Sequence, residues 1–257
     1  MLSAIIWGLV QGLTEFLPIS SSGHLVLVPA FLNAAGLELA EPSLAVSAVL
    51  HLGTLLAVLF YFRRDVLRLL RFRADPGARR LWMLLVVGTI PAVVGLPLEG
   101  HLERLQDDPR NVGIALLGTA LLLVAGSWLT TGTRGLDEAR PLDALVVGVF
   151  QALALIPGIS RSGSTIVAGT GRGLTPMEAA RYSFLLGVPA IAGGGAISLA
   201  RISDTGGLDA SLLVGLATAA VSGYLAISLL LAALRRVGLI PFALYAVLAG
   251  GAAIVLL

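Results

Sequence analysis

The stretch "GLVQGLTEFLPISSSGHLV", residues 8–26, places a glutamate, three serines and a histidine inside an otherwise apolar segment. Its pattern is that of two short apolar helices on either side of a Pro-Ile-Ser-Ser-Ser-Gly turn, and each helix is shorter than the roughly 20 residues that cross a bilayer. Such a broken helix is tolerated at membrane depth only where it is buried in protein or lines a wet cavity. The pattern therefore predicts a re-entrant hairpin over residues 1–32.

The same pattern returns 140 residues later as "GVFQALALIPGISRSGSTI", residues 148–166. At this fixed shift, seven of nineteen positions are identical. The matching residues are Gly8, Gln11, Leu13, Ile19, Ser20, Ser22 and Gly23 in the first copy and Gly148, Gln151, Leu153, Ile159, Ser160, Ser162 and Gly163 in the second. The match predicts an internal repeat, with a second re-entrant hairpin over residues 143–172.

The rest of the chain is strongly apolar. Of its 257 residues 57% are hydrophobic and 12% are charged, and the mean hydropathy is +0.94, whereas an average soluble domain is about one quarter charged. Membrane spans are expected at residues 43–62, 81–98, 111–131, 176–202, 210–234 and 238–257. The predicted fold class is an all-α polytopic membrane protein, with a single membrane domain over residues 1–257.

Each half of the chain then contains one hairpin and three crossings. Because three is an odd number, the second copy must be inverted in the membrane relative to the first. We place the first inverted-topology repeat at residues 1–135 and the second at residues 136–257. Inverted repeats with broken helices hold their site near the midplane, between the two copies.

Charged residues set the expected orientation. The segment "RRDVLRLLRFRADPGARR", residues 63–80, holds seven arginines, which predicts a cytoplasmic loop. Counting crossings from it puts the acidic loop 99–110, Asp204, Asp209 and both termini on the outer side. Cysteine is absent, which excludes disulfides, thiolate metal sites and a cysteine nucleophile. The small net charge of +2 comes from arginines placed where membrane topology would put them, so no nucleic acid partner is expected.

Glu15, His24 and Arg161 are ionisable residues inside the apolar hairpins, away from the hairpin ends. Burying such a group in a membrane costs about 2.5–3.5 kcal/mol on insertion scales, so each is a candidate functional residue. Gln11 and Glu15, four positions apart, share one helix face and suit a hard cation, Mg²⁺ or Ca²⁺, whose other ligands phosphate would supply. Two alternatives stay open: Gln11 only hydrogen-bonds a neighbouring helix, or Glu15 and Arg161 form an internal ion pair.

The serines lie just before the second half of each hairpin. Hydroxyls in that position cap free N–H groups, and the same amides with the positive end of the helix dipole form a phosphate cradle. The candidate phosphate-binding residues are Ser20, Ser22, Gly23, Ser160, Ser162 and Gly163. The second loop, "GISRSGST" (158–165), carries Arg161 where the first has Ser21, and arginine offers a charged fork that matches phosphate oxygens. Together the loops predict a site for a highly charged anion.

His24 lies three residues after Ser21, so it could accept the serine proton or act as an acid. The alternative is a satisfied core histidine. The other two histidines, His51 in "SAVLHLGTLLAVLFYF" and His101 in an outer loop, lack such polar company. We interpret both as structural.

At these residues the chain resembles the undecaprenyl pyrophosphate phosphatase family of bacteria, the bacitracin-resistance type. The first family motif is matched by "QGLTEFLPISSSGH" and the second by "PGISRSGST". The length, the apolar spans and the closing "RRVGLIPFALYAVLAG" also fit, so the resemblance covers essentially the whole chain. One departure is Gln11, where many members have glutamate, and this removes one charge from the expected cation site.

The resemblance implies hydrolysis of the terminal phosphate of undecaprenyl pyrophosphate at the outer face of the bacterial plasma membrane, for peptidoglycan synthesis. It assigns Glu15 to the metal and pyrophosphate site, Ser21 as nucleophile or phosphate ligand, His24 as base or acid, and Arg161 as phosphate clamp. Thr165, with Ser20 and Ser160, matches supporting polar positions. The expected partners are this lipid substrate and membrane lipids. Serine or water as nucleophile, the identity of the cation and a homodimer stay open.

Two other functions compete with this reading. Inverted repeats with broken helices are typical of transporters, so a lipid-phosphate flippase or anion transporter working by alternating access is the main alternative. A symmetric transport site would keep polar groups on both hairpins, yet Leu155 and Ser164 stand at the positions that match Glu15 and His24, which favours an enzyme. The other large class of membrane lipid phosphatases also uses a Ser-Gly-His loop, but it opens with a lysine-containing motif and this chain has no lysine.

Overall fold

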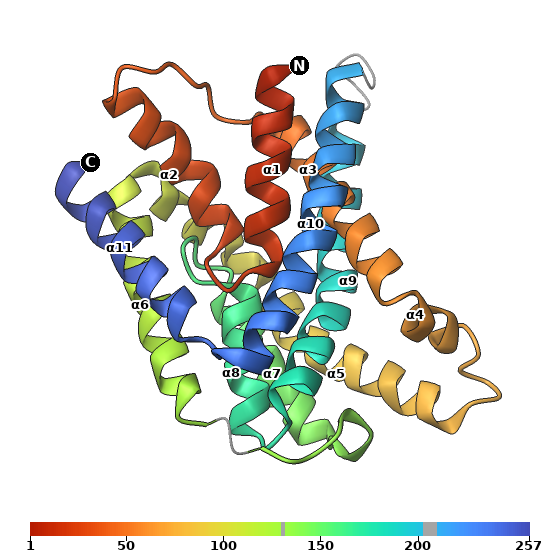
Figure 1. Cartoon of the computed structure of the whole chain (residues 1–257). Coiled ribbons are helices and arrows are strands. Elements are labelled where there is room, and N and C mark those ends of the chain that lie inside the picture. The colour runs from red at the N-terminus through yellow and green to blue at the C-terminus, as the bar shows by residue number, and fades with distance from the viewer. Residues whose placement is uncertain (130–131, 203–209) are drawn as a thin grey trace.

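A computed structural model describes residues 1–129, 132–202 and 210–257, and the regular elements within these ranges are helices (Figure 1). They are α1 (Leu2–Phe16), α2 (Ser21–Ala34), α3 (Leu44–Tyr61), α4 (Arg63–Leu69), α5 (Pro76–Leu102), η1 (Glu103–Asp107), α6 (Pro109–Ser127), η2 (Leu136–Glu138), α7 (Pro141–Leu153), α8 (Arg161–Gly171), α9 (Pro176–Ile202), α10 (Ala210–Arg236) and α11 (Ile240–Leu256). The expected outer loop with Asp204 and Asp209 lies outside the described residues, as does the end of the span expected at 111–131.

A long helix begins and ends near each span expected from the sequence, namely α3, α5, α6, α9, α10 and α11. Within the described ranges, α5 with η1, α6 and α10 are each long and apolar enough to cross a membrane. A fourth crossing results if α3 and α4, which bend by 83° at their junction, count as one span. Helix α11, with 17 residues, falls just below the length of a straight crossing. The chain is therefore a multi-pass membrane protein.

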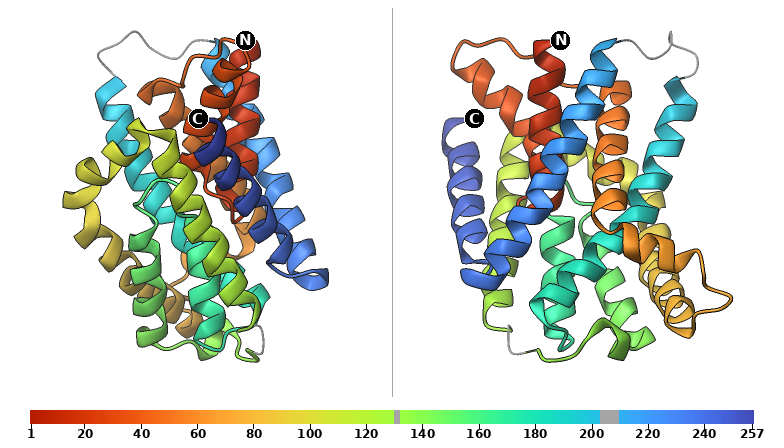
Figure 2. Two further views of the ribbon diagram at one scale, coloured as in Figure 1. Left: turned by 90° about the vertical axis from the view of Figure 1, so that its left-hand side faces the viewer. Right: turned by 45° about the vertical axis from the view of Figure 1, so that its right-hand side comes forward.

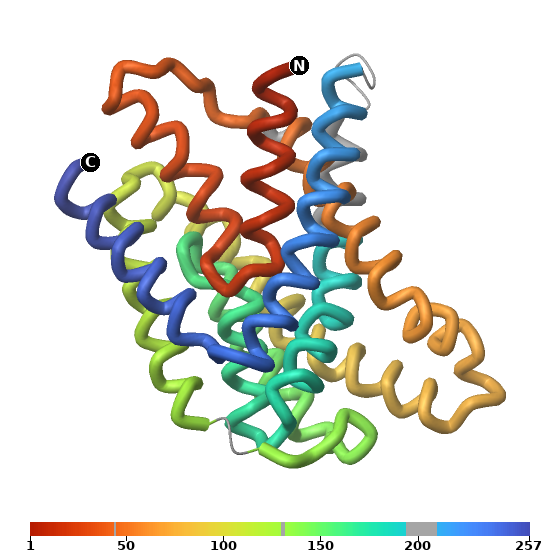
Figure 3. Tube along the Cα trace, in the orientation of Figure 1, coloured from red at the N-terminus to blue at the C-terminus, as the bar shows by residue number. Residues whose placement is uncertain are grey.

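Two helical hairpins enter the bundle from opposite ends, and their tips meet in the middle of the molecule (Figures 1 and 3). One consists of α1 and α2, the other of α7 and α8. Each second helix begins with the serine cap that its sequence predicts: the Ser20 hydroxyl accepts from the Gly23 N–H at 3.3 Å, and the Ser160 hydroxyl accepts from the Gly163 N–H at 3.1 Å. The Ser-x-x-Gly spacing that both loops share is therefore explained by helix capping.

Small residues let each hairpin pack tightly against a long helix. Helix α1 contacts α10 at Gly12, where an added Cβ would collide with the Ser222 hydroxyl, and α7 contacts α5 at Gly148, where it would collide with the Gly88 carbonyl. Inside a membrane no hydrophobic gain drives helices together, so close van der Waals packing at small residues is what holds them. The two hairpins are fixed by the same means on different partners.

Aromatic side chains support the tip of the first hairpin. Phe16, the last residue of α1, is fully buried and meets Phe184 of α9 edge-on at 5.5 Å between ring centroids. Phe184 in turn contacts Phe62, at the end of α3, at 5.9 Å. The polar turn that follows Phe16 is therefore anchored on rigid packing, which fixes the position of Glu15 beside it.

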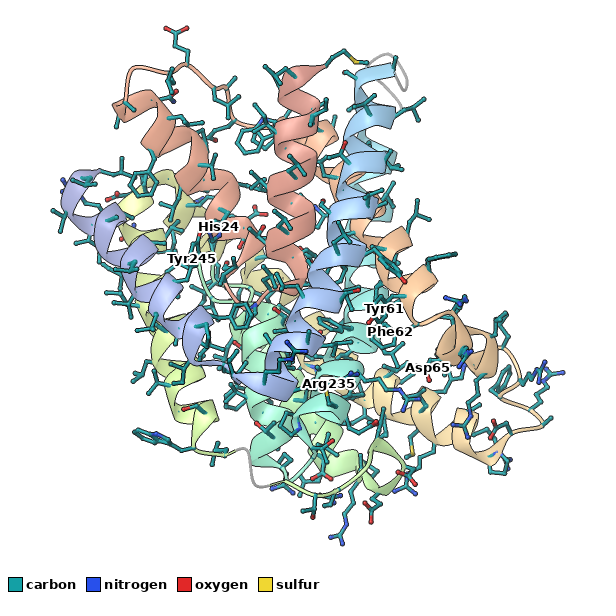
Figure 4. The ribbon with its side chains drawn as sticks, in the orientation of Figure 1. His24, Tyr61, Phe62, Asp65, Arg235 and Tyr245 are labelled. Carbon is teal, nitrogen blue, oxygen red and sulfur yellow. The ribbon has the colours of Figure 1, made fainter. Side chains whose placement is uncertain are left out.

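The arginine-rich end of the molecule carries most of its ion pairs. Asp143, at the start of α7, is buried between Arg134 and Arg172, each at 2.8 Å. Asp65 of α4 pairs with Arg181 of α9; Asp65 is labelled in Figure 4. Hydrogen bonds from Arg68 lower the pKa of Asp75 to about 2. Both termini lie toward the opposite end (Figure 2).

Candidate functional site

The two hairpin tips are joined at Glu15. Its carboxylate accepts from the Arg161 guanidinium at 2.8 Å through Oε1, and from the Ser21 hydroxyl at 2.6 Å and the Gln11 amide at 3.0 Å through Oε2. Glu15 is 7% exposed, so these bonds form where water competes little and each is correspondingly strong. The structure thus brings together four residues that the sequence predicted. Two of them, Glu15 and Arg161, are 146 positions apart in the chain.

Helix α6 and the first loop hold the second tip in place. Thr119 of α6 donates to the Gly158 carbonyl at 2.8 Å and accepts from the Ser160 N–H at 2.9 Å. The Ser162 hydroxyl donates to the Leu17 carbonyl of the first tip at 3.1 Å. Gly158 has a φ of +97°, a backbone conformation that needs glycine. These contacts fix where Arg161 begins α8.

A cavity of about 360 Å³ lies over the joined tips. It is lined by Thr14, Glu15, Ser20, Ser21, Ser22, Ser47, Ala48, His51, Glu99, Glu103, Ala154, Ile159, Ser160, Arg161, Ala190 and Ile191. The lining includes the first residues of both α2 and α8, so the positive ends of two helix dipoles face one space. One guanidinium nitrogen of Arg161, Nη1, is buried and has no hydrogen bond partner. The arrangement can bind a compact, highly charged anion.

His24 is directed away from this cavity. Its Nδ1 bonds the Ser20 carbonyl at 2.7 Å, and its Nε2 bonds the hydroxyl of Tyr245, on α11, at 2.7 Å. The two rings are nearly parallel, with centroids 5.6 Å apart. Both residues are labelled in Figure 4. Because a carbonyl only accepts, Nδ1 carries the hydrogen and Nε2 is occupied by the tyrosine. His24 and Ser21 thus share a hairpin but not a hydrogen bond.

His51 takes the place in the cavity that we expected for His24. Its Nδ1 bonds the Ser47 carbonyl at 2.8 Å, which leaves Nε2 facing Glu15 Oε2 at 3.9 Å. The side chain is 33% exposed and lines the cavity. The sequence predicts a structural role for His51 because its neighbours in "AVLHLGT" are mostly apolar. Nothing in that stretch indicates that α3 packs against the first hairpin, and this packing is what brings His51 to the cavity.

The remaining predicted residues divide into two groups. Ser20, Ser22 and Ser160 line the cavity, whereas Ser162, Gly163 and Thr165 lie in the buried face of α8 beneath it. The Thr165 hydroxyl donates to the Arg161 carbonyl at 2.7 Å and bonds Ser183 of α9 at 2.6 Å. Gly23 lies close to Gly158 of the second loop. The second group supports the tips rather than lining the space.

Oxygen ligands for a cation are few. The Gln11 Oε1 atom is buried and accepts no hydrogen bond, while the amide nitrogen of the same side chain donates to the Glu15 carboxylate. Among the described residues, no three His, Cys, Asp or Glu side chains cluster closely enough to hold a metal ion. This set does not suffice for a cation held by protein alone, but it fits a hard cation that brings phosphate oxygens as its other ligands.

Comparisons with known proteins find relatives that match nearly the whole chain. The family model described as bacitracin resistance protein BacA matches residues 4–252. A Methanosphaera stadtmanae protein named undecaprenyl-diphosphatase is 41% identical over 100% of this chain and 98% of its own length. Proteins of the same name from Geobacter sulfurreducens and Desulforudis audaxviator are 41% and 43% identical, each over 98% of this chain and 96% of their own length. The chain therefore belongs to the bacitracin resistance protein BacA family.

Proposed function

We propose that this protein hydrolyses the terminal phosphate of undecaprenyl pyrophosphate and releases undecaprenyl phosphate. The observation that carries the proposal is the Arg161 guanidinium, which lines the cavity beside a carboxylate that already accepts the Ser21 hydroxyl. The guanidinium pairs with Glu15 through Nη2, and a pyrophosphate would supply a second anion with further acceptor oxygens. The name undecaprenyl-diphosphatase, shared by relatives that cover nearly the whole chain, supports this substrate.

Ser21 and Glu15 form the nucleophile and base of the proposed reaction. Ser21 Oγ is 2.6 Å from Glu15 Oε2, within the reach required for proton transfer. In the first step Oγ bonds to the terminal phosphorus, the bond from that phosphorus to the bridging oxygen breaks, and the serine proton passes through Glu15 to the leaving undecaprenyl phosphate. In the second step water cleaves the phosphoserine, and Glu15 transfers a proton from the water to Ser21.

Charge stabilisation is assigned to Arg161 of the second hairpin together with groups from both tips and from α3. Phosphoryl transfer depends mainly on positioning and on neutralising charge on the equatorial oxygens. Arg161 and the amides at the starts of α2 and α8 meet at the cavity, so they are placed for this role. His51, whose Nε2 faces the same carboxylate, contacts the phosphate from the side of α3. His24 positions α2 against α11 through Tyr245.

A divalent cation, Mg²⁺ or Ca²⁺, is the proposed cofactor. Glu15 and Gln11 would hold it, with the remaining ligands from the substrate and water. When bound, it would neutralise charge on the pyrophosphate. The carboxylates of Glu99 and Glu103 also line the cavity, and an anionic substrate meets less repulsion from them if it arrives with a cation.

Two inverted repeats, residues 1–135 and 136–257, are the proposed architecture, each with one re-entrant hairpin and three crossings. Support comes from α6 and α11, which lie side by side and run in opposite directions (Figures 1 and 2). A Cβ on Gly113 would meet Gly250, Ala253 and Ile254, and one on Gly250 would meet Gly113, Leu116 and Leu117, so the contacts exchange at a constant offset of 137 residues. Such reciprocal contacts are those of a two-fold axis between the copies.

The proposed location is the inner membrane of a bacterium, with the cavity open to the outer face and both termini on that side. The arginines of residues 63–80 lie on α4, on the turn after it and at the start of α5, whereas Glu99 and Glu103 lie at the other end of α5 and line the cavity. The positive-inside rule then puts the arginine-rich end in the cytoplasm. The asymmetric placement of Glu15 and Ser21 on one hairpin argues for hydrolysis over alternating-access transport.

The test is phosphate release from C55 pyrophosphate by the detergent-solubilised protein. The unaltered protein releases phosphate, a chelator lowers the rate, and Ser21→Ala lowers it by about 10³-fold or more because the nucleophile is lost. Substrate labelled in its terminal phosphate labels Ser21 in single-turnover experiments. Ser228→Ala is the matched control, because that hydroxyl donates only within α10, to the Tyr224 carbonyl. Near-normal release by Ser21→Ala would disprove the serine mechanism.

A further inference from the structure

A second cavity, almost wholly apolar, lies beside the one that holds Glu15. Its volume is about 560 Å³. It is lined by Leu59, Val66, Leu69, Leu70, Trp82, Leu85, Val86, Thr89, Ile90, Val93, Val94, Leu185, Val188 and Pro189. These residues come from α3, α4, α5 and α9, and we call the space the α5–α9 groove. Many of its side chains on α5, including Val86 and Ile90, are about half exposed, so the groove opens toward the lipid.

The α5–α9 groove offers no free polar group to a ligand. Its polar side chains are Thr89, whose hydroxyl donates to the Leu85 carbonyl at 2.7 Å, and Trp82, whose indole N–H donates to the Leu69 carbonyl at 3.0 Å. Because both donors are satisfied within the protein, only hydrocarbon fits the groove without leaving a polar partner unpaired. The bond from Trp82 to Leu69 also ties α5 to α4 and closes the end near the arginine-rich loop.

The groove and the polar cavity meet on α9. Leu185 and Val188 line the groove, and Ile191, three residues further on the same helix face, lines the polar cavity. The neighbouring Gly187 lies against the Arg161 guanidinium. On α5 the groove reaches Val94, and Glu99 of the polar cavity follows about 7.5 Å further along the helix axis. A ligand with a charged head at Arg161 can therefore extend its tail directly into the groove.

We propose that the α5–α9 groove binds the first isoprene units of the substrate's polyprenyl chain while the pyrophosphate is held at Arg161. This rests on the proposed function and adds a chain-binding subsite to it. Lipid tails are as apolar as leucine, so no hydrophobic gain draws the chain out of the bilayer. The groove therefore acts through shape: it fits the methyl-branched chain and directs the attached phosphates toward Ser21.

Narrowing the groove tests the proposal. Val86→Trp fills it near its middle, and Val221→Trp is the matched control, because Val221 lies on α10, outside the groove, and is similarly exposed at 64% against 53% for Val86. We expect kcat/KM for C55 pyrophosphate to fall about tenfold in Val86→Trp, as overfilling of a packed site predicts. The value for a C10 prenyl pyrophosphate stays within about twofold, because the short chain does not reach Val86 and the chemistry is unaltered. Equal losses for both substrates, or the same loss in Val221→Trp, would overturn the proposal.

A binding readout separates this proposal from the proposed hydrolysis. C55 pyrophosphate with a photoreactive diazirine on its first isoprene units is crosslinked to the unaltered protein. Labelling of Ile90 or Val188 supports the groove whether or not phosphate is released. Labelling confined to α6, α10 or α11 overturns it. A phospholipid with a diazirine in its acyl chain is the competitor, and labelling of the groove at equal strength by this lipid would show an ordinary lipid contact and also overturn the proposal.

Discussion

The two hairpin tips share one scaffold and divide the chemistry between them. In both, the N-cap serine accepts from a glycine N–H three residues on and contacts the serine two residues on, at 3.3 Å for Ser20 with Ser22 and 3.2 Å for Ser160 with Ser162. Between each pair of serines stands a different residue: Ser21 in the first tip and Arg161 in the second. The same capping pattern thus provides two equivalent frames, and the residue between the serines is a hydroxyl in one and a cation in the other.

The backbones of the two tips also differ. Ser20 has a φ of 70°, whereas its counterpart Ser160 has a φ of −75°. In the second tip the positive φ falls on Gly158 instead. A non-glycine residue held in that region costs about 1–3 kcal/mol and persists only where its surroundings require it. The strained residue is the one directly before Ser21, so the first tip stores strain where the proposed nucleophile must be aimed.

Making the tips alike is the change with the largest expected effect. Arg161→Ser gives both loops a serine at this position, and we expect phosphate release to fall by about 10³-fold, because removing one preorganised donor to the phosphate costs about 10²–10³ and the salt bridge is lost as well. Arg161→Lys keeps the charge but not the fork, so it should recover only part of the rate. Rates come from phosphate release in detergent.

The stability of Arg161→Ser must be measured as well, because Glu15 would be left buried without the guanidinium that pairs with it. Removing one partner of a buried pair costs about 3–5 kcal/mol, so Arg161→Ser should also melt at a lower temperature. The double variant Glu15→Gln/Arg161→Ser should recover much of the melting temperature but none of the activity. If Arg161→Lys instead retained full activity and Arg161→Ser lost only stability, the pair would be a structural ion pair alone.

A smaller loss of catalytic rate is expected from a substitution that displaces the Arg161 side chain without replacing it. A Cβ on Gly187 would collide with the Arg161 guanidinium, so Gly187→Ala should displace the group from both Glu15 and the phosphate. Misplacing a catalytic group by about 1 Å can lower a rate by about 10²-fold, and we expect a decrease of about 10- to 100-fold in kcat.

Gly193→Ala is the control on the same helix, because nothing lies within 4 Å of a Cβ there. Both variants gain the same helix propensity, of up to about 1 kcal/mol. If both substitutions lowered kcat equally, the role of Gly187 would not be to leave room for the Arg161 guanidinium. The displaced guanidinium should also weaken the link between the tips, which a lower melting temperature of Gly187→Ala would report.

Most of the fold follows from the sequence because hydropathy and the motif that returns after 140 residues indicate it directly. The shift of 140 residues identified both hairpins, and α3, α5, α6, α9, α10 and α11 lie close to the expected spans. The separation of α4 from α3 was not predicted. Residues 63–69 are arginine-rich, so they were assigned to a loop, whereas the structure turns them into a short helix bent by 83° from α3.

Within the site, the residues of the two tips were predictable and the histidines were not. Glu15, Ser21 and Arg161 meet because both motifs lie on hairpin turns whose tips face each other, and the sequence match at a shift of 140 residues pairs the two turns. His24 lies one turn from Ser21 in the sequence, but the hydroxyl of Tyr245 draws its ring toward α11. That contact spans 221 residues, and so no local pattern could indicate it. His51 reaches Glu15 only through the packing of α3, which is equally invisible in the sequence.

The smallest expected effect concerns the strained cap, and it tests whether the tips differ in backbone energy as well as in side chains. Ser20→Gly loses the cap at a cost of a few tenths of a kcal/mol and gains chain entropy in the unfolded state, but it removes about 1–3 kcal/mol of strain at a φ of 70°. Ser160→Gly has the same losses and no strain to relieve at a φ of −75°. We expect Ser20→Gly to leave the free energy of unfolding unchanged or to raise it by about 1 kcal/mol, and Ser160→Gly to lower it by about 1 kcal/mol.

Denaturation in mixed detergent micelles measures both, and equal destabilisation of the two variants would mean that Ser20 bears no strain. A more stable Ser20→Gly that releases phosphate more slowly would show that the strain holds Ser21 toward Glu15.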